Sequence, residues 1–174
     1  AAALVAAAVA LDEFARNLDT TRLPRVKGTA LFLMAYPDIT PRSLLHHLKH
    51  NKVLHEQVLL LYVQVERVPR VPAVRRLEVQ DLGQGLLRLT ARCGFMQHLD
   101  MREVLQLLSA RGVALAAEVT YYLGHITVRT TGRTRWPAWR KALFAFLFNN
   151  EPPPTILLGV PPNRIVELGE QTEI

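Results

Sequence analysis

The sequence predicts an α+β (mixed α/β) fold: a mixed sheet of about six to seven strands, about three packed helices and an N-terminal arm. Two observations lead to this prediction. Apolar runs of strand length alternate with stretches that carry apolar residues at helical spacing, and Gly, Pro and Asn separate them. Hydrophobic residues make up 49% of the chain, which is enough to bury a core and argues against disorder.

The length of 174 residues fits one domain with an appended segment. The chain begins with Ala-rich sequence rather than Met, so we expect a piece of a longer protein or a processed chain. Residues 1–22 are predicted to be a linker or arm, helical in part, and residues 23–174 the domain proper. No apolar run reaches the roughly 18 residues that a membrane-spanning helix needs.

A strand, a helix and a second strand are predicted first. Residues 28–35 form a short apolar run, and residues 58–65 are aliphatic enough for a strand buried on both faces. Between them, Thr40 is the predicted N-cap, Pro41 the first helical residue and Asn51 the left-handed residue that ends the helix. The apolar face of this helix consists of Leu44, Leu45 and Leu48. This order predicts a parallel strand pair with a right-handed crossover.

An antiparallel hairpin and a capped helix follow. Residues 75–80 and 87–93 alternate apolar and polar side chains around Gly83-Gln84-Gly85, and the single cysteine, Cys93, is expected to be a small core residue. Asp100 with Glu103 three residues on resembles a capping box, and the helix it begins should end at Gly112.

The last third of the chain predicts more strands and one more helix. Residues 119–123 and 126–130 are expected to be two strands joined around Gly124-His125. Residues 136–148 are predicted to be a helix, and residues 164–168 a final strand.

Nothing in the sequence predicts catalysis. The glycine-rich, nucleophile and metalloprotease motifs are missing, so we expect no enzyme, no catalytic or metal-binding residues and no cofactor in this chain. His46 and His50 are four residues apart and could share a metal, but their helix face lies opposite Leu44 and Leu48. A solvated surface or a contact between subunits is therefore the expected role of these histidines.

The formal charge of +6 comes largely from arginines in two segments. With Trp136 and Trp139 nearby, they suit phosphate groups of a nucleotide or single-stranded nucleic acid; the alternative is a solvated basic face with both tryptophans in the core. The candidate ligand or interface contacts are Arg67, Arg70, Arg75, Arg76, Arg129, Arg133 and Arg135.

Four collinear segments resemble the C-terminal region of the KUP/HAK/KT potassium uptake permeases. HHLKHNKVLHEQVLLLYVQVE (46–66) resembles the family signature, and LPRVKGTALFL (23–33) resembles its "RVPGTAVF" entry. RLTARCGFMQHLDMREVL (88–105) is similar to its "YGF" segment, and VPPNRIVELGEQTEI (160–174) to its C-terminal end. The signature includes a polar turn expected to fix the crossover or touch a partner, formed by Lys49, His50, Asn51, Lys52, His55 and Glu56.

The resemblance implies a regulatory and dimerisation domain on the cytoplasmic side of the cell (inner) membrane, in a multi-pass potassium:proton symporter. The membrane part would transport K⁺ and H⁺, so this chain would hold no transport site. The implied partners are the protein's own transmembrane part and a second copy. As an alternative, the resemblance implies a domain that senses cyclic di-adenosine monophosphate through the arginines. A nucleic-acid-binding module is a third hypothesis, which the basic charge alone suggests, and we expect no nucleic acid partner.

Overall fold

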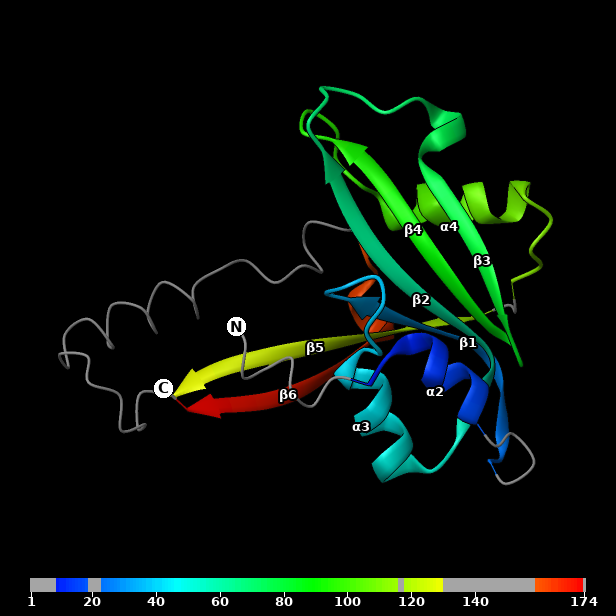
Figure 1. Ribbon diagram of the computed structural model, residues 1–174, viewed down its shortest axis with the longest axis vertical. Helices are drawn as coiled ribbons and strands as arrows, with labels where there is room; N and C mark the ends of the chain where they lie inside the picture. The colour runs from blue at the N-terminus through cyan, green and yellow to red at the C-terminus, as the bar shows by residue number, and fades with distance from the viewer. Residues whose placement is uncertain (1–8, 19–22, 116–117, 130–158, 174) are drawn as a thin grey trace, which may run out of the picture.

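The structure is a computed structural model that describes residues 9–18, 23–115, 118–129 and 159–173 (Figure 1). Within these ranges, helices pack on both faces of a six-stranded sheet with the order β3-β4-β2-β1-β5-β6, which confirms the predicted mixed α+β fold. The strands are β1 (Arg25–Met34), β2 (Leu54–Glu66), β3 (Leu77–Gly83), β4 (Leu86–Gly94), β5 (Val119–Arg129) and β6 (Ile165–Glu173). The helices are α2 (Leu11–Asn17), α3 (Arg42–Asn51) and α4 (Met101–Ala110), with short 3₁₀ turns η1 (Ala73–Arg75) and η2 (Pro162–Arg164).

The sheet is parallel except at one edge. β1 and β2, which α3 connects in the sequence, pair in parallel with each other. β3 and β4 pair antiparallel, and the sequence predicts both arrangements. β2 and β4 then pair in parallel from Val58 opposite Leu86 to Glu66 opposite Gly94. The β3–β4 turn places Gln84 at a positive φ of 54°, between two glycines that also have positive φ.

The core is divided by the sheet into two clusters. On one face, α4 contributes Val104 and Leu108 to a cluster with the strand residues Leu59, Leu61 and Leu89. On the other face, residues from the arm, β1, α3, β2 and β5 form the second cluster, which includes Leu11, Phe32, Leu44, Leu60 and Tyr122. Neighbouring strand residues such as Leu60 and Leu61 point to opposite faces because a strand has a period of two. Burial on both faces explains the apolar run in β2.

The predicted break at Gly124-His125 is wrong, because β5 is one continuous strand from Val119 to Arg129. It pairs in parallel with β6 from Tyr121 opposite Ile165 to Arg129 opposite Glu173. Gly124 continues the ladder opposite Leu168. A glycine inside a strand is tolerated when a neighbouring strand supplies the hydrogen bonds. Here that strand is β6, which lies far along the chain, so the sequence around Gly124 does not reveal it. The final predicted strand is confirmed and is longer than expected. The predicted helix at 136–148, with its tryptophans, lies outside the described residues.

The predicted boundaries of α3 are each wrong by one residue. The helix begins at Arg42, and its N-cap position is Pro41, which has no side chain to cap it. The backbone N–H of Thr40 instead donates to the carbonyl of Val9 at 2.9 Å, where the arm joins the domain. At the other end, Lys52 and not Asn51 has the left-handed conformation, with a φ of 54° and an N–H that donates to Leu48 O.

The cap of α4 is confirmed in part. A carboxylate oxygen of Asp100 accepts a hydrogen bond from the Arg102 N–H at 2.8 Å, so Asp100 is the N-cap. The capping-box role of Glu103 is wrong, because its carboxylate pairs with the guanidinium of Arg76. That ion pair ties α4 to the start of β3. Cys93 is buried at the end of β4, as predicted.

Candidate functional site

The histidine segment divides into an exposed face and a buried one. His46 and His50 are exposed, and their rings stack with centroids 5.9 Å apart. The described residues contain no group of three or more His, Cys, Asp or Glu side chains placed to hold one metal ion.

His47 is the residue of this segment that the sequence analysis missed. It is buried under α3, and the side-chain amide of Asn51 lies 2.9 Å from its Nδ1. Its ring packs edge-on against Tyr122 at a centroid distance of 4.8 Å and lies 5.9 Å from the ring of His55. The signal was present in the sequence, because residue 47 follows the buried Leu44 at a spacing of three and faces the same side of the helix.

Burial disfavours the charged form of both imidazoles. The pKa of His47 is lowered mainly by burial, and the nearby His55 lowers it further, while the backbone of Val53 acts in the opposite direction. Burial also lowers the pKa of His55. Nε2 of His47 and Nδ1 of His55 are buried without a hydrogen-bond partner in the described structure. A proton added to either ring would place an uncompensated charge between α3 and the sheet.

The signature turn joins several distant segments of the chain. Leu54 N donates to Pro24 O at 3.0 Å, so the start of β2 is held by the segment before β1. The Arg25 guanidinium donates to His55 O and to Gln84 O, both at 2.8 Å. It therefore ties β2 to the β3–β4 turn. Of the six predicted turn residues, His55 takes part in these contacts through its backbone carbonyl, and the role of the turn in fixing the crossover stays a prediction.

The predicted arginines differ in how they are engaged. Arg67 and Arg70 are exposed in the loop after β2, and neither has an ion-pair or hydrogen-bond partner among the described residues. Arg75 lies 3.6 Å from a carboxylate oxygen of Glu66, and Arg76 is largely buried in its pair with Glu103. Arg129 ends β5, whereas Arg133 and Arg135 lie outside the described residues.

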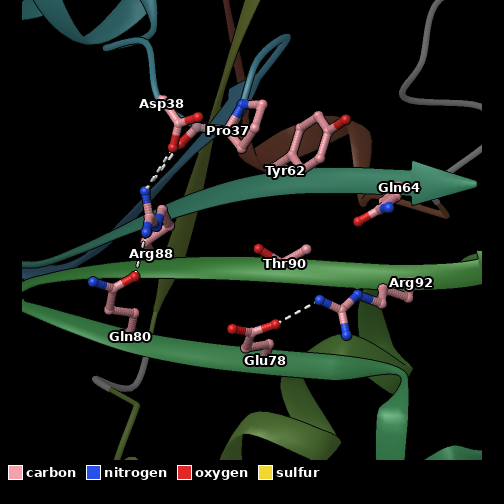
Figure 2. Close-up of a pocket in the computed structure, with 9 residues that line it drawn as sticks. All are labelled: Pro37, Asp38, Tyr62, Gln64, Glu78, Gln80, Arg88, Thr90 and Arg92. Atoms are coloured by element: carbon pink, nitrogen blue, oxygen red, sulfur yellow. Dashed lines mark hydrogen bonds and ion pairs between the residues drawn. The ribbon is translucent and has the colours of Figure 1, made fainter. Parts of the chain in front are cut away.

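A polar groove lies on the face of β3, β4 and β2 that is opposite α4 (Figure 2). Arg88 reaches Asp38 at 3.2 Å and donates a hydrogen bond to the side chain of Gln80, while Arg92 pairs with Glu78 at 2.7 Å. The groove has a volume of about 210 Å³ and is lined by Pro37, Asp38, Tyr62, Gln64, Glu78, Gln80, Arg88, Thr90 and Arg92.

The charges in the groove balance. Arg92 pairs with Glu78 across neighbouring strands, and Arg88 pairs with Asp38 in the turn after β1, so much of the hydrogen-bonding capacity is already used inside the chain. Such a surface suits a partner with alternating donors and acceptors better than it suits a free anion. The alternation in residues 75–80 and 87–93 predicts that these polar side chains share one face of the sheet. It does not predict that the groove they form is lined without any residue of a described helix.

Comparison with known proteins identifies the family. Residues 27–174 match the family model described as the K⁺ potassium transporter C-terminal domain. The chain is 43% identical over 171 residues to the probable potassium transport system protein Kup 1 of Syntrophobacter fumaroxidans, covering 98% of this chain and 26% of that protein. It is 36% identical over 165 residues to the corresponding Kup protein of Chlorobaculum tepidum, covering 94% of this chain and 27% of the relative.

The match is nearly complete for this chain and partial for its relatives. The chain spans about a quarter of the length of the curated relatives that it matches. Their names describe transport proteins, in agreement with the expectation that this chain is not an enzyme. No solved structure matches the chain. None of the described helices is both long and apolar enough to cross a membrane. From the family model and the identities together, the chain belongs to the family of K⁺ potassium transporter C-terminal domains.

Proposed function

We propose that this chain is the regulatory and dimerisation domain of a potassium importer, held on the cytoplasmic side of the cell membrane. The membrane part of the protein would carry K⁺ together with H⁺. The family match and the names of the relatives support the transporter. The domain would act without chemistry, by changing contacts between protomers or with the membrane part and so shifting a conformational equilibrium.

The observation that carries this proposal is the polar groove over β3, β4 and β2, whose lining includes no residue of a described helix. Arg92 and Glu78 are exposed or half-exposed there and lie on adjacent strands. In a two-fold contact the same surface of both copies meets, so Arg92 of one copy would face Glu78 of the other, and Glu78 of the first would face Arg92 of the second. A self-complementary surface lets a chain of net charge +6 meet its own copy without local repulsion.

The test uses the full-length transporter that carries this domain. The double substitution Arg88→Glu and Arg92→Glu makes the groove acidic and should shift a dimer toward monomer, measured as mass by light scattering. It should also change potassium uptake in cells that lack other importers. The matched control is Arg16→Glu with Lys27→Glu, which makes the same charge change on exposed positions of α2 and β1. An unchanged mass and unchanged uptake in the groove variant would count against the groove as the protomer contact.

A rescue arm separates contact from damage. Glu78→Arg alone and Arg92→Glu alone should each weaken the homodimer, while the two variants mixed should form a heterodimer with restored opposite charges. The pair is half-exposed, so its loss within one chain should cost less than about 1 kcal/mol of folding free energy. Failure of the mixture to associate better than either variant would argue that the charges do not meet across protomers.

A second candidate function is the sensing of a nucleotide second messenger such as cyclic di-adenosine monophosphate. The observation that favours it is the pair of exposed arginines, Arg67 and Arg70, which no described carboxylate neutralises. Guanidinium groups bind phosphates by paired, charge-assisted hydrogen bonds. Calorimetry on the folded chain tests the idea: saturable binding at micromolar ligand that Arg67→Ala with Arg70→Ala abolishes supports it, and no heat of binding rejects it.

A further inference from the structure

We propose that one end of the domain docks on an anionic lipid surface. This end, called the tip below, consists of residues 65–75, which follow the core of β2, and residues 94–97, which follow β4. Figure 1 shows these loops at the end of the sheet where β2 and β4 finish, away from α3. The inference rests on the proposed function in one respect, since a domain attached to a transporter is held beside a bilayer.

The tip exposes large apolar side chains that the core does not use. Phe95 and Met96 are 62% and 66% exposed, although both residue types are usually buried in a globular domain. Val68 and Val74 lie in the opposite loop and are 40% and 82% exposed. Contiguous exposed apolar groups on a folded protein indicate a surface that is covered by something else.

The tip is held together by hydrogen bonds, so the exposure is not a result of fraying. The Phe95 N–H donates to Val68 O at 3.0 Å, and the Met96 N–H donates to Pro69 O at 3.2 Å. The side chain of Gln97 bridges the two loops, because its Oε1 accepts hydrogen bonds from Val71 N at 2.8 Å and from Gly94 N at 2.9 Å. The two loops therefore present their apolar side chains from a fixed backbone.

Arginines flank the apolar group. Arg67 and Arg70 are exposed and have no ion-pair partner among the described residues. Arg75 is also exposed and pairs with Glu66, which is half-buried and is shared with Arg92. The outward charge of the tip is therefore positive. Arginine near an anionic leaflet gains electrostatic attraction, and its aliphatic stem can lie along the apolar boundary while the guanidinium stays with the phosphates.

The shape and composition favour lipid over a protein partner. The exposed apolar residues lie on two loops at the end of the sheet, whereas the groove described above lies on the sheet face. Aromatic and methionine side chains on such loops can enter the boundary between headgroups and acyl chains, while basic residues contact the phosphates around them. A balanced charge pattern like that of the groove would fit a protein, but the tip has an excess of one sign.

The experiment measures binding of the 174-residue chain to vesicles by co-sedimentation. Vesicles of phosphatidylglycerol with phosphatidylethanolamine should bind the chain, and phosphatidylcholine vesicles should not. Binding should weaken as ionic strength rises from about 0.1 M to about 1 M, because surface charges are then screened. Arg67→Ala with Arg70→Ala should lower the affinity about 25-fold, at about fivefold for each arginine. Phe95→Ser with Met96→Ser should lower it at least about tenfold.

Two matched control variants distinguish an effect of the tip residues from a general loss of positive charge or of an exposed aromatic side chain. Arg16→Ala with Lys49→Ala removes the same charge from exposed positions of α2 and α3, and Tyr36→Ser removes an aromatic side chain that is 57% exposed outside the tip. Both should bind like the unchanged chain. Circular dichroism confirms that each variant is folded. Millimolar inorganic phosphate or a nucleotide should not release the chain from vesicles, which separates lipid headgroups from a free phosphate ligand.

Two results would overturn the inference. One is the absence of binding to anionic vesicles by the folded chain. If tip substitutions then disrupt assembly of the full-length transporter, the tip is a protein contact instead. The other is equal loss of binding in the tip and control variants, which would reduce the effect to net charge. Neither result bears on whether removal of the domain alters potassium uptake, so a failure here is distinct from a failure of the proposed function.

Discussion

Gly94, the last residue of β4, packs against the backbone of Pro69 and Arg70 in the other loop of the tip. A Cβ added there would stand 2.6 Å from Arg70 N and would overlap the carbonyl of Pro69. Both neighbours are backbone atoms, which cannot rotate away as a flexible side chain can. The substitution Gly94→Ala must therefore push the two loops apart and strain the hydrogen bonds from Phe95 and Met96.

The expected cost is about 1–3 kcal/mol of unfolding free energy, the range for inserting a methyl group into a closely packed site. For a chain of this length, each 1 kcal/mol corresponds to about 2–4 °C in melting temperature. Gly124→Ala is the matched control, because Gly124 also lies in a strand and nothing is within 4 Å of its added Cβ. That change should be neutral or slightly stabilising, since alanine loses less backbone freedom on folding than glycine.

Urea unfolding followed by circular dichroism measures both variants against the unchanged chain. The account predicts a clear loss for Gly94→Ala and no loss for Gly124→Ala. The vesicle affinity of Gly94→Ala should fall as well, because Phe95 and Met96 would lose their fixed positions. Equal stability of the two alanine variants would refute the close packing of the tip loops and the rigidity on which the lipid inference depends.

Three further predictions concern α3 and α4. The lowered pKa values of His47 and His55 mean that the unfolded chain binds more protons, so stability is complete above their ordinary pKa of 6.5 and declines as pH falls toward the lowered values. In urea titrations, His47→Leu should make this decline shallower, and an unchanged decline would contradict the burial argument. Asn51→Ala removes the hydrogen bond to His47 and should cost about 1 kcal/mol, whereas Lys49→Ala should cost less than about 0.5 kcal/mol. Asp100→Ala removes the cap of α4 and should cost about 0.5–2 kcal/mol, while Asp100→Asn keeps most of it; a melting curve for each variant decides the matter.

Local patterns were sufficient to predict much of the sheet. The apolar run in β2 and the alternation in β3 and β4 are periodic signals, and each led to the correct element. The errors came from long-range contacts. The continuity of β5 depends on its pairing with β6, about forty residues later in the chain, and Thr40 is held by the arm instead of capping α3. No pattern within a short window contains either partner.

The candidate sites were less accessible to sequence reasoning. Residue types drew attention to exposed histidines, whereas the buried His47 is the one that contacts Tyr122 and His55. Counting charged residues identified the arginines of the loop after β2 as candidates. It did not reveal that Arg76 forms an ion pair with Glu103 of α4, the helix that packs on β3. The groove arises because α3 and α4 cover different halves of the sheet on opposite faces, which is a property of the tertiary arrangement (Figure 1).

The central claim is that this domain regulates a potassium importer through contacts of its folded surface. The most direct measurement compares potassium uptake and oligomeric mass of the full-length transporter with those of a version that lacks this domain, in cells without other importers. The account predicts that the truncated protein reaches the membrane but shows a changed dependence of uptake on conditions and a weakened dimer. Unchanged assembly, unchanged uptake and unchanged regulation in the truncated protein would contradict it.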